Sequence, residues 1–108
     1  MRIIHVALSV ANLDDAIAET QQRLGFAPCV IVPNTYALFR SKMVNLSLSQ
    51  KPEEAGRLRH LGFEDPDAPG FSLDTDGEGF LWERFTAEQQ AQEINKFWPG
   101  TNYTAGTI

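Results

Sequence analysis

The sequence contains very little cysteine. Cys29 is the only one, so no disulfide can form within the chain and several thiolates cannot hold a metal there. A lone thiol fits a reducing compartment, and we expect a cytoplasmic protein. No apolar run approaches the roughly 18 residues of a membrane span, and no signal-peptide pattern opens the chain. We therefore expect neither a membrane anchor nor a leader.

Basic residues are also scarce. The chain has 9 Lys and Arg against 14 Asp and Glu, which gives a formal net charge of −5. The basic residues are scattered, whereas nucleic acids and anionic membranes select clustered positive charge. We therefore expect a partner of neither kind.

The apolar content is sufficient for one core. Hydrophobic residues make up 43 % of 108 residues, which predicts a single domain over residues 1–108. A chain this short buries only a modest fraction of its surface, so oligomerisation would be a natural supplement.

The first half of the chain begins with a strand pattern. Residues 3–10 alternate with a period of two, which is typical of a strand. One face carries branched apolar side chains, and the other carries His5, Ala7 and Ser9. A helix at 13–24 is predicted next, since Asn12 is a suitable N-cap. Further strands are predicted at 26–32, 35–40 and 43–49, so residues 1–50 form a β-α-β-β-β module.

The second half repeats the beginning of the first. His60 opens the run His-Leu-Gly-Phe in a predicted strand at 57–64, and this run echoes His5-Val-Ala-Leu at an offset the size of one such module. Shorter strands at 71–73 and 80–85 follow, and then a helix at 87–98. The second half has no room for a counterpart of the helix at 13–24. The fold class is therefore α+β, with a complete module followed by a shortened second one at 57–98.

Two imidazoles and one carboxylate suggest a metal centre. His5 and His60 are the only histidines, and Glu83 lies on the predicted last strand. Such a set holds a divalent ion with open positions and is the usual face for non-haem iron. The candidate ions are Fe(II), Zn, Ni, Mn and Co. Glu83 is also the candidate catalytic residue, and Ser9, Asn45 and Ser47 are predicted to line the pocket.

Plainer interpretations of these residues stay open. A single histidine in a strand is more often structural or exposed than a ligand, and Glu83 would ordinarily pair with a Lys or Arg. Glu64 is a weak second candidate for a general base. The acidic stretch at 74–79 begins like a calcium loop, but Phe85 stands where the twelfth-position Glu belongs, so we interpret it as a turn.

Three stretches resemble the vicinal oxygen chelate superfamily, the group of glyoxalases, bleomycin-resistance proteins and extradiol dioxygenases. The first is the run from His5 to Ile17 followed by Leu24-Gly25-Phe26, which is similar to the family's opening strand and helix. The second is Arg59-His60-Leu61-Gly62-Phe63-Glu64. The third is Asp74-Thr75-Asp76-Gly77 leading to Trp82-Glu83, which resembles the family's closing turn and acidic strand.

This resemblance implies a curved mixed sheet, with helices on its outer face, that forms a cup around a metal. The family's ligands would correspond to His5, His60 and Glu83, while the fourth position offers only Asn45, Ser47 or Ser49. The shortened second module would leave part of the cup wall to the helix at 87–98 or to a second chain, and we expect a homodimer.

Three functions follow as alternatives. The first is a metal-dependent lyase or dioxygenase that acts on a small molecule. The second is a non-catalytic protein that sequesters a drug or toxin, with Tyr36, Phe39 and Trp82 lining an aromatic groove of a dimer. The third is a degenerate member of the family that holds no metal.

Overall fold

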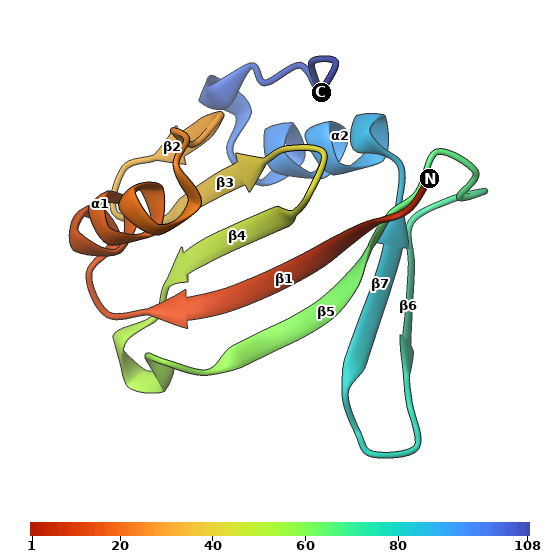
Figure 1. The fold of residues 1–108 in the computed structure, drawn as a ribbon, viewed down its shortest axis with the longest axis horizontal. Helices are drawn as coiled ribbons and strands as arrows, with labels where there is room; N and C mark the ends of the chain where they lie inside the picture. The colour runs from red at the N-terminus through yellow and green to blue at the C-terminus, as the bar shows by residue number, and fades with distance from the viewer.

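A seven-stranded mixed sheet forms the body of the protein in the computed structural model, which describes residues 1–108 (Figure 1). The strands are β1 (Ile3–Val10), β2 (Val30–Val32), β3 (Tyr36–Arg40), β4 (Asn45–Gln50), β5 (Leu58–Glu64), β6 (Ser72–Thr75) and β7 (Leu81–Phe85). The helices are α1 (Leu13–Leu24) and α2 (Ala87–Phe97), with 3-10 turns η1 (Pro52–Glu54) and η2 (Pro99–Thr101). The predicted α+β class is confirmed. No helix in the structure is long and apolar enough to cross a membrane.

Local sequence signals set the ends of both helices. The Asn12 side chain accepts a hydrogen bond from the backbone N–H of Asp15, and Gly25 closes α1 with a left-handed φ of 86°. Thr86 and Gln89 form a reciprocal capping box at the start of α2. The predicted strand at 26–32 is shortened to β2, because Pro28 has no N–H to offer a neighbouring strand.

The sheet joins two related halves at its centre. The strand order is β2-β3-β4-β1-β5-β7-β6, so the first half (residues 1–50) meets the second half (residues 57–98) where β1 pairs with β5. These two strands are antiparallel, with His5 opposite Gly62 and Ala7 opposite His60. In the repeat, His5 corresponds to His60 and Ala7 corresponds to Gly62. The pair His5–Gly62 therefore corresponds to the pair His60–Ala7, and a local twofold axis relates the two histidines. Each first strand also has a parallel neighbour, β4 for β1 and β7 for β5.

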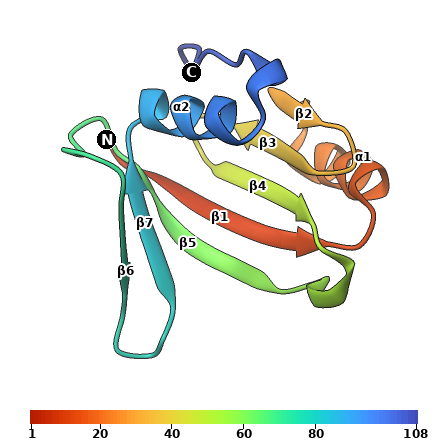
Figure 2. The same ribbon diagram turned by 180° about the vertical axis from the view of Figure 1, so that it is seen from behind.

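The two helices lie on opposite faces of the sheet. Leu13 of α1 packs with Phe39 on the outer face, where the helices were expected. Ile94 of α2 instead packs with Leu38, the residue before Phe39 in β3, whose side chain points to the inner face. The expectation of helices on the outer face therefore applies to α1 only. The C-terminal helix covers part of the inner face over the strands of the first half, where Ile94 packs with Leu38 of β3 (Figure 2).

The polar face of β1 is the better buried one. His5 is 3 % exposed and Ala7 is fully buried, whereas Ile4 on the outer face is 38 % exposed. The inner face is covered by α2 and the curvature of the sheet, while α1 covers only the part of the outer face near β3 and β4. The histidines therefore lie in a largely enclosed environment.

Candidate metal centre and its cavity

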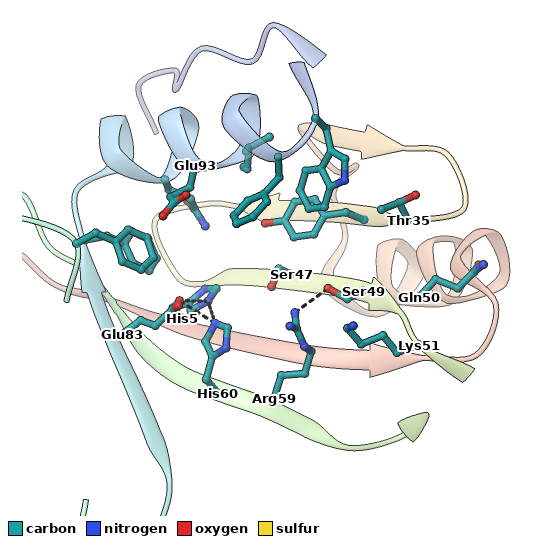
Figure 3. A pocket seen from close by; sticks show the side chains of 17 residues that line it. His5, Thr35, Ser47, Ser49, Gln50, Lys51, Arg59, His60, Glu83 and Glu93 are labelled. Carbon is teal, nitrogen blue, oxygen red and sulfur yellow. Dashed lines mark hydrogen bonds and ion pairs between the residues drawn. The ribbon is translucent and has the colours of Figure 1, made fainter. Parts of the chain in front are cut away.

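Three side chains from three strands meet on the inner face. Nε2 of His5 lies 3.0 Å from Nε2 of His60 and 3.6 Å from Oε1 of Glu83. Nε2 of His60 lies 2.8 Å from the same carboxylate oxygen. Figure 3 shows the three groups pointing toward one another at the floor of a cavity. The structure therefore brings together all three residues that the sequence suggested as ligands.

The spacing of these donor atoms suits a shared ion. Atoms bound about 2.1 Å from one ion lie roughly 3.0 Å apart at an octahedral corner and roughly 3.4 Å apart in a tetrahedral site. The three observed separations span 2.8–3.6 Å. Two imidazole nitrogens this close also need a proton or a cation between them, since their lone pairs repel each other. The residues present therefore fit a divalent transition-metal ion.

Asn45 fixes the orientation of His5. Nδ1 of His5 lies 2.9 Å from the side-chain oxygen and 3.0 Å from the backbone oxygen of Asn45. Because both neighbours are acceptors, Nδ1 carries the proton and Nε2 presents its lone pair to the site. Burial lowers the pKa of His5 below its ordinary value, which favours the neutral, metal-binding form.

A buried polar network supports Asn45 in turn. The Asn45 amide donates to Glu64 at 2.9 Å and exchanges two hydrogen bonds with Gln90 of α2, at 2.7 and 3.0 Å. Glu64 is held on its other side by both ends of the Arg40 fork, at 2.8 and 2.9 Å. This ion pair occupies the Glu64 carboxylate, which leaves Glu64 unsuited to act as a general base.

A cavity of about 460 Å³ opens above the three donor groups, between the sheet and α2. Its size is in the range of small-molecule sites. One wall is aromatic, with Tyr36 and Trp98 stacked at 4.7 Å between ring centroids, beside Phe97. Lys51 and Arg59 also line the cavity, and Arg59 donates to Ser49, the cross-strand partner of Tyr36.

The predicted pocket residues have different positions. Ser47 lies in the cavity wall, but Ser9 and Asn45 do not. The Ser9 hydroxyl is buried and donates to Glu54 of η1 at 2.7 Å. Asn45 is fully buried beneath Gln90 and reaches the site only through His5.

The predicted aromatic groove is not formed. Tyr36 lines the cavity, but Phe39 is its near neighbour on β3 and points to the opposite face, into the α1 core. Trp82 stacks on Phe63 at 5.7 Å on the outer face, as the period of two in a strand requires.

The acidic stretch at 74–79 forms a turn, as interpreted from the sequence. The Asp76 carboxylate accepts hydrogen bonds from the backbone of Glu78 and Phe80 and from the Trp82 indole. These bonds account for its oxygens within the chain itself.

Glu93 and Arg59 are among the cavity residues that escaped the sequence analysis. Glu93 lies on the face of α2 that carries Ile94 and lines the cavity, and its Oε2 is buried without a hydrogen-bond partner in the protein. Arg59 also lines the cavity beside His60. The signal for Glu93 was a carboxylate next to the apolar stripe of an amphipathic helix, whereas Arg59 depends on an irregularity of β5 that the sequence does not show.

Comparisons with known proteins do not assign the chain. No protein-family profile matches it, and no curated protein matches its sequence.

Proposed function

We propose that this protein binds a divalent transition-metal ion through His5, His60 and Glu83 and uses it to act on a small molecule held in the adjoining cavity. The observation that carries the proposal is the convergence of three donor atoms within 3.6 Å of one another, from both halves of the chain. The oriented lone pair of His5 and the cavity directly above support it.

The resemblance to the vicinal oxygen chelate superfamily agrees with this proposal. That family would place its ligands on the first strand of each module and on a last strand. His5, His60 and Glu83 occupy β1, β5 and β7. By the twofold relation, Glu83 beside Gly62 corresponds to Ser47 beside Ala7. Glyoxalase-type members of the family have a fourth ligand, and a serine occupies its position here. This favours the lyase and dioxygenase branches, which use three ligands.

The chain supplies the remaining groups that such chemistry needs. A bound ion would act as a Lewis acid or redox centre toward an oxygenated ligand. Glu93 lines the cavity, and its carboxylate would accept a proton from that ligand. Gln90 and Phe85 help to close the floor around the donor groups, which limits access of water.

The second candidate is a binding protein that sequesters a drug or toxin without chemistry. The stacked Tyr36–Trp98 pair and the exposed Phe97 ring favour it, because a broad aromatic wall binds flat apolar molecules by contact area. In this case the cavity would take up its ligand equally well after metal removal.

Metal content decides between these functions. Protein purified without chelator should contain about one transition-metal ion per chain by elemental analysis, and His60→Ala and Glu83→Gln should lose it. Glu78→Gln in the exposed turn is the matched control and should keep the metal. A wild-type protein that stays metal-free after incubation with Fe(II), Zn, Ni, Mn and Co would refute the metal centre.

A homodimer and a cytoplasmic location complete the proposal. Apolar side chains of the second half lie exposed, with Leu73 at 57 %, Phe80 at 52 % and Leu81 at 40 %. Burial of these side chains against a second copy of the chain would favour self-association. Light scattering coupled to size-exclusion chromatography would then detect twice the chain mass. The single, exposed Cys29 suits the reducing cytoplasm.

A further inference from the structure

A β-bulge in β5 turns Arg59 into the cavity. Ala7 pairs with His60, but the next residue of β1, Leu8, pairs with Leu58, so Arg59 has no partner across the strand pair. In a regular strand Arg59 and His60 would point to opposite faces. The extra residue of a bulge changes the direction of a side chain, and Arg59 and His60 line the same cavity.

The charge of Arg59 is poorly neutralised within the protein. Its Nη1 donates to the Ser49 hydroxyl at 3.0 Å, and its nearest carboxylate is Glu54, 4.0 Å from Nε. That carboxylate already accepts the Ser9 hydroxyl. Arg40, in contrast, makes two bonds of 2.8 and 2.9 Å to Glu64. Arg59 therefore keeps most of its five N–H donors available to a ligand.

Further donors surround Arg59 at the same end of the cavity. Lys51 and Ser49 line it, and Figure 3 shows them beside Arg59 and away from Glu83. Lys51 forms no ion pair within the protein, although its side chain lines the cavity. One end of the cavity thus carries the three candidate metal-binding groups, and the other carries two cations and the Ser49 hydroxyl.

We propose that Arg59 and Lys51 bind an oxyanion, a carboxylate or a phosphate, of a small acidic ligand whose other end reaches the His5–His60–Glu83 centre. The planar Arg fork matches either group with two parallel hydrogen bonds. The position of the ligand's chelating end rests on the proposed function. Recognition of the anion does not, because Arg59 and Lys51 are separate from the metal-binding groups.

The first experiment uses metal-free protein, so it tests the anion site alone. Benzoate and inorganic phosphate are titrated separately into chelator-treated protein, with the fluorescence of the tryptophans, of which Trp98 lines the cavity, as the readout. Wild type should bind at least one of them, and Arg59→Gln should weaken that binding about tenfold or more. The stronger of the two anions identifies the preferred oxyanion.

Arg57→Gln is the matched control, since this change removes the same charge from an exposed position outside the cavity. It should bind both anions as wild type does. Equal affinities in wild type, Arg57→Gln and Arg59→Gln, or no binding of either anion by wild type, would overturn the proposal. Lys51→Gln, at a half-buried side chain, should weaken binding in the same direction and serves if Arg59→Gln does not fold, as judged by circular dichroism.

The second experiment adds the metal end. Zinc-loaded protein is titrated calorimetrically with 8-hydroxyquinoline and with its 5-sulfonate, two chelators that differ by one anionic group. Wild type should prefer the sulfonate about tenfold, and Arg59→Gln should lose this preference while still binding the parent chelator. If zinc does not bind but metal-free protein still selects anions through Arg59, the proposed function fails and the oxyanion site stands. If zinc and the parent chelator bind without any preference for the sulfonate, the oxyanion site fails and the proposed metal centre stands.

Discussion

The two halves of the sheet share a strand plan but are stabilised in different ways. The first half has α1 against its outer face and α2 against its inner face, and both apolar clusters draw on its strands. No residue of β5, β6 or β7 belongs to either cluster. Of these strands only β5 pairs with β1, while β7 pairs with β5 and β6 with β7. The buried ring of Phe85 stacks on Phe71 there, and ion pairs such as Arg40–Glu64 add polar links. The comparison shows that strand pairing and polar links contribute more where the module is shortened.

The two histidines show the same contrast. His5 is 3 % exposed and its Nδ1 is fixed by Asn45, whereas the His60 side chain is 17 % exposed and contacts only His5 and Glu83 among the polar groups of the protein. In the proposed metal centre the first half would therefore supply a rigid ligand and the second an adjustable one. Variants that exchange properties between the halves test this difference.

The largest effect should come from breaking the link between the halves. Arg40→Met leaves the buried Glu64 carboxylate without its partner and should lower the free energy of unfolding by about 3–5 kcal/mol. Urea denaturation measures it. Arg23→Met is the control, because it removes an exposed pair with Glu19 and should cost under about 1 kcal/mol. Similar losses in both variants would contradict the assigned role of the buried pair.

The next effect concerns equivalent small residues beside the parallel strands. A Cβ added at Gly62 would lie 2.4 Å from the backbone oxygen of Glu83, whereas Ala7 holds the equivalent place in the first half. Gly62→Ala should therefore separate β5 from β7 and destabilise the protein by about 1–3 kcal/mol. Ala7→Gly removes a methyl group and adds backbone freedom, and it should cost about 1 kcal/mol. Thermal melts of both compare the halves directly, and a harmless Gly62→Ala would show that β7 is free to shift.

A third change makes His5 resemble His60. Asn45→Leu removes the side-chain acceptor at Nδ1 of His5 and leaves only the backbone oxygen, and it should weaken metal binding about 10–100-fold, as loss of such supporting hydrogen bonds does. Competition with a chromophoric chelator measures the affinity. Leu81→Asn, at the start of β7, is the reciprocal control and should change it little. Unchanged affinity in Asn45→Leu would mean that the side-chain oxygen is not needed and that the backbone oxygen of residue 45 suffices to orient the imidazole.

The smallest effect depends on pH. The backbone N–H of Asp67 and the Arg84 guanidinium lower the pKa of Asp65, which follows β5. A lowered pKa in the folded state stabilises the protein above the ordinary carboxyl pKa, and this contribution is lost as the pH falls through the lowered value. Asp65→Asn should therefore destabilise the protein at neutral pH, and its difference from wild type should shrink in acid. Asp67→Asn is the control, and melting curves across pH provide the measurement. A difference that stays constant into acid would contradict this role of Asp65.

Elements written in local patterns were predictable from the sequence. The alternation in residues 3–10 and the caps Asn12 and Thr86 indicated β1 and the starts of both helices correctly. The three candidate ligands followed from their chemistry and from the repeat that relates His60 to His5. For β1 and the helix starts, neighbouring residues in the chain determine the outcome, whereas the three candidate ligands are distant in the sequence.

The remaining features depend on contacts between distant segments. The amphipathic pattern of α2 indicates an apolar side, but not which face of the sheet that side covers, so Glu93 and Gln90 were missed. The bulge at Arg59 arises from the register between β1 and β5. Asn45 looked like a pocket residue because its strand alternates, yet α2 covers it with Gln90.

The pairing of β1 with β5 has a further consequence. Each strand carries one imidazole, so an ion held by both would act as a crosslink between the two modules, which are distant in the chain. The unfolded chain cannot bring the two imidazoles together, so a bound ion would stabilise only the folded state. Metal binding would therefore raise the melting temperature of the protein. At a free ion concentration about one hundred times the dissociation constant, this coupling adds about 2.7 kcal/mol. The same ion would then supply reactivity to the cavity and cohesion to the sheet.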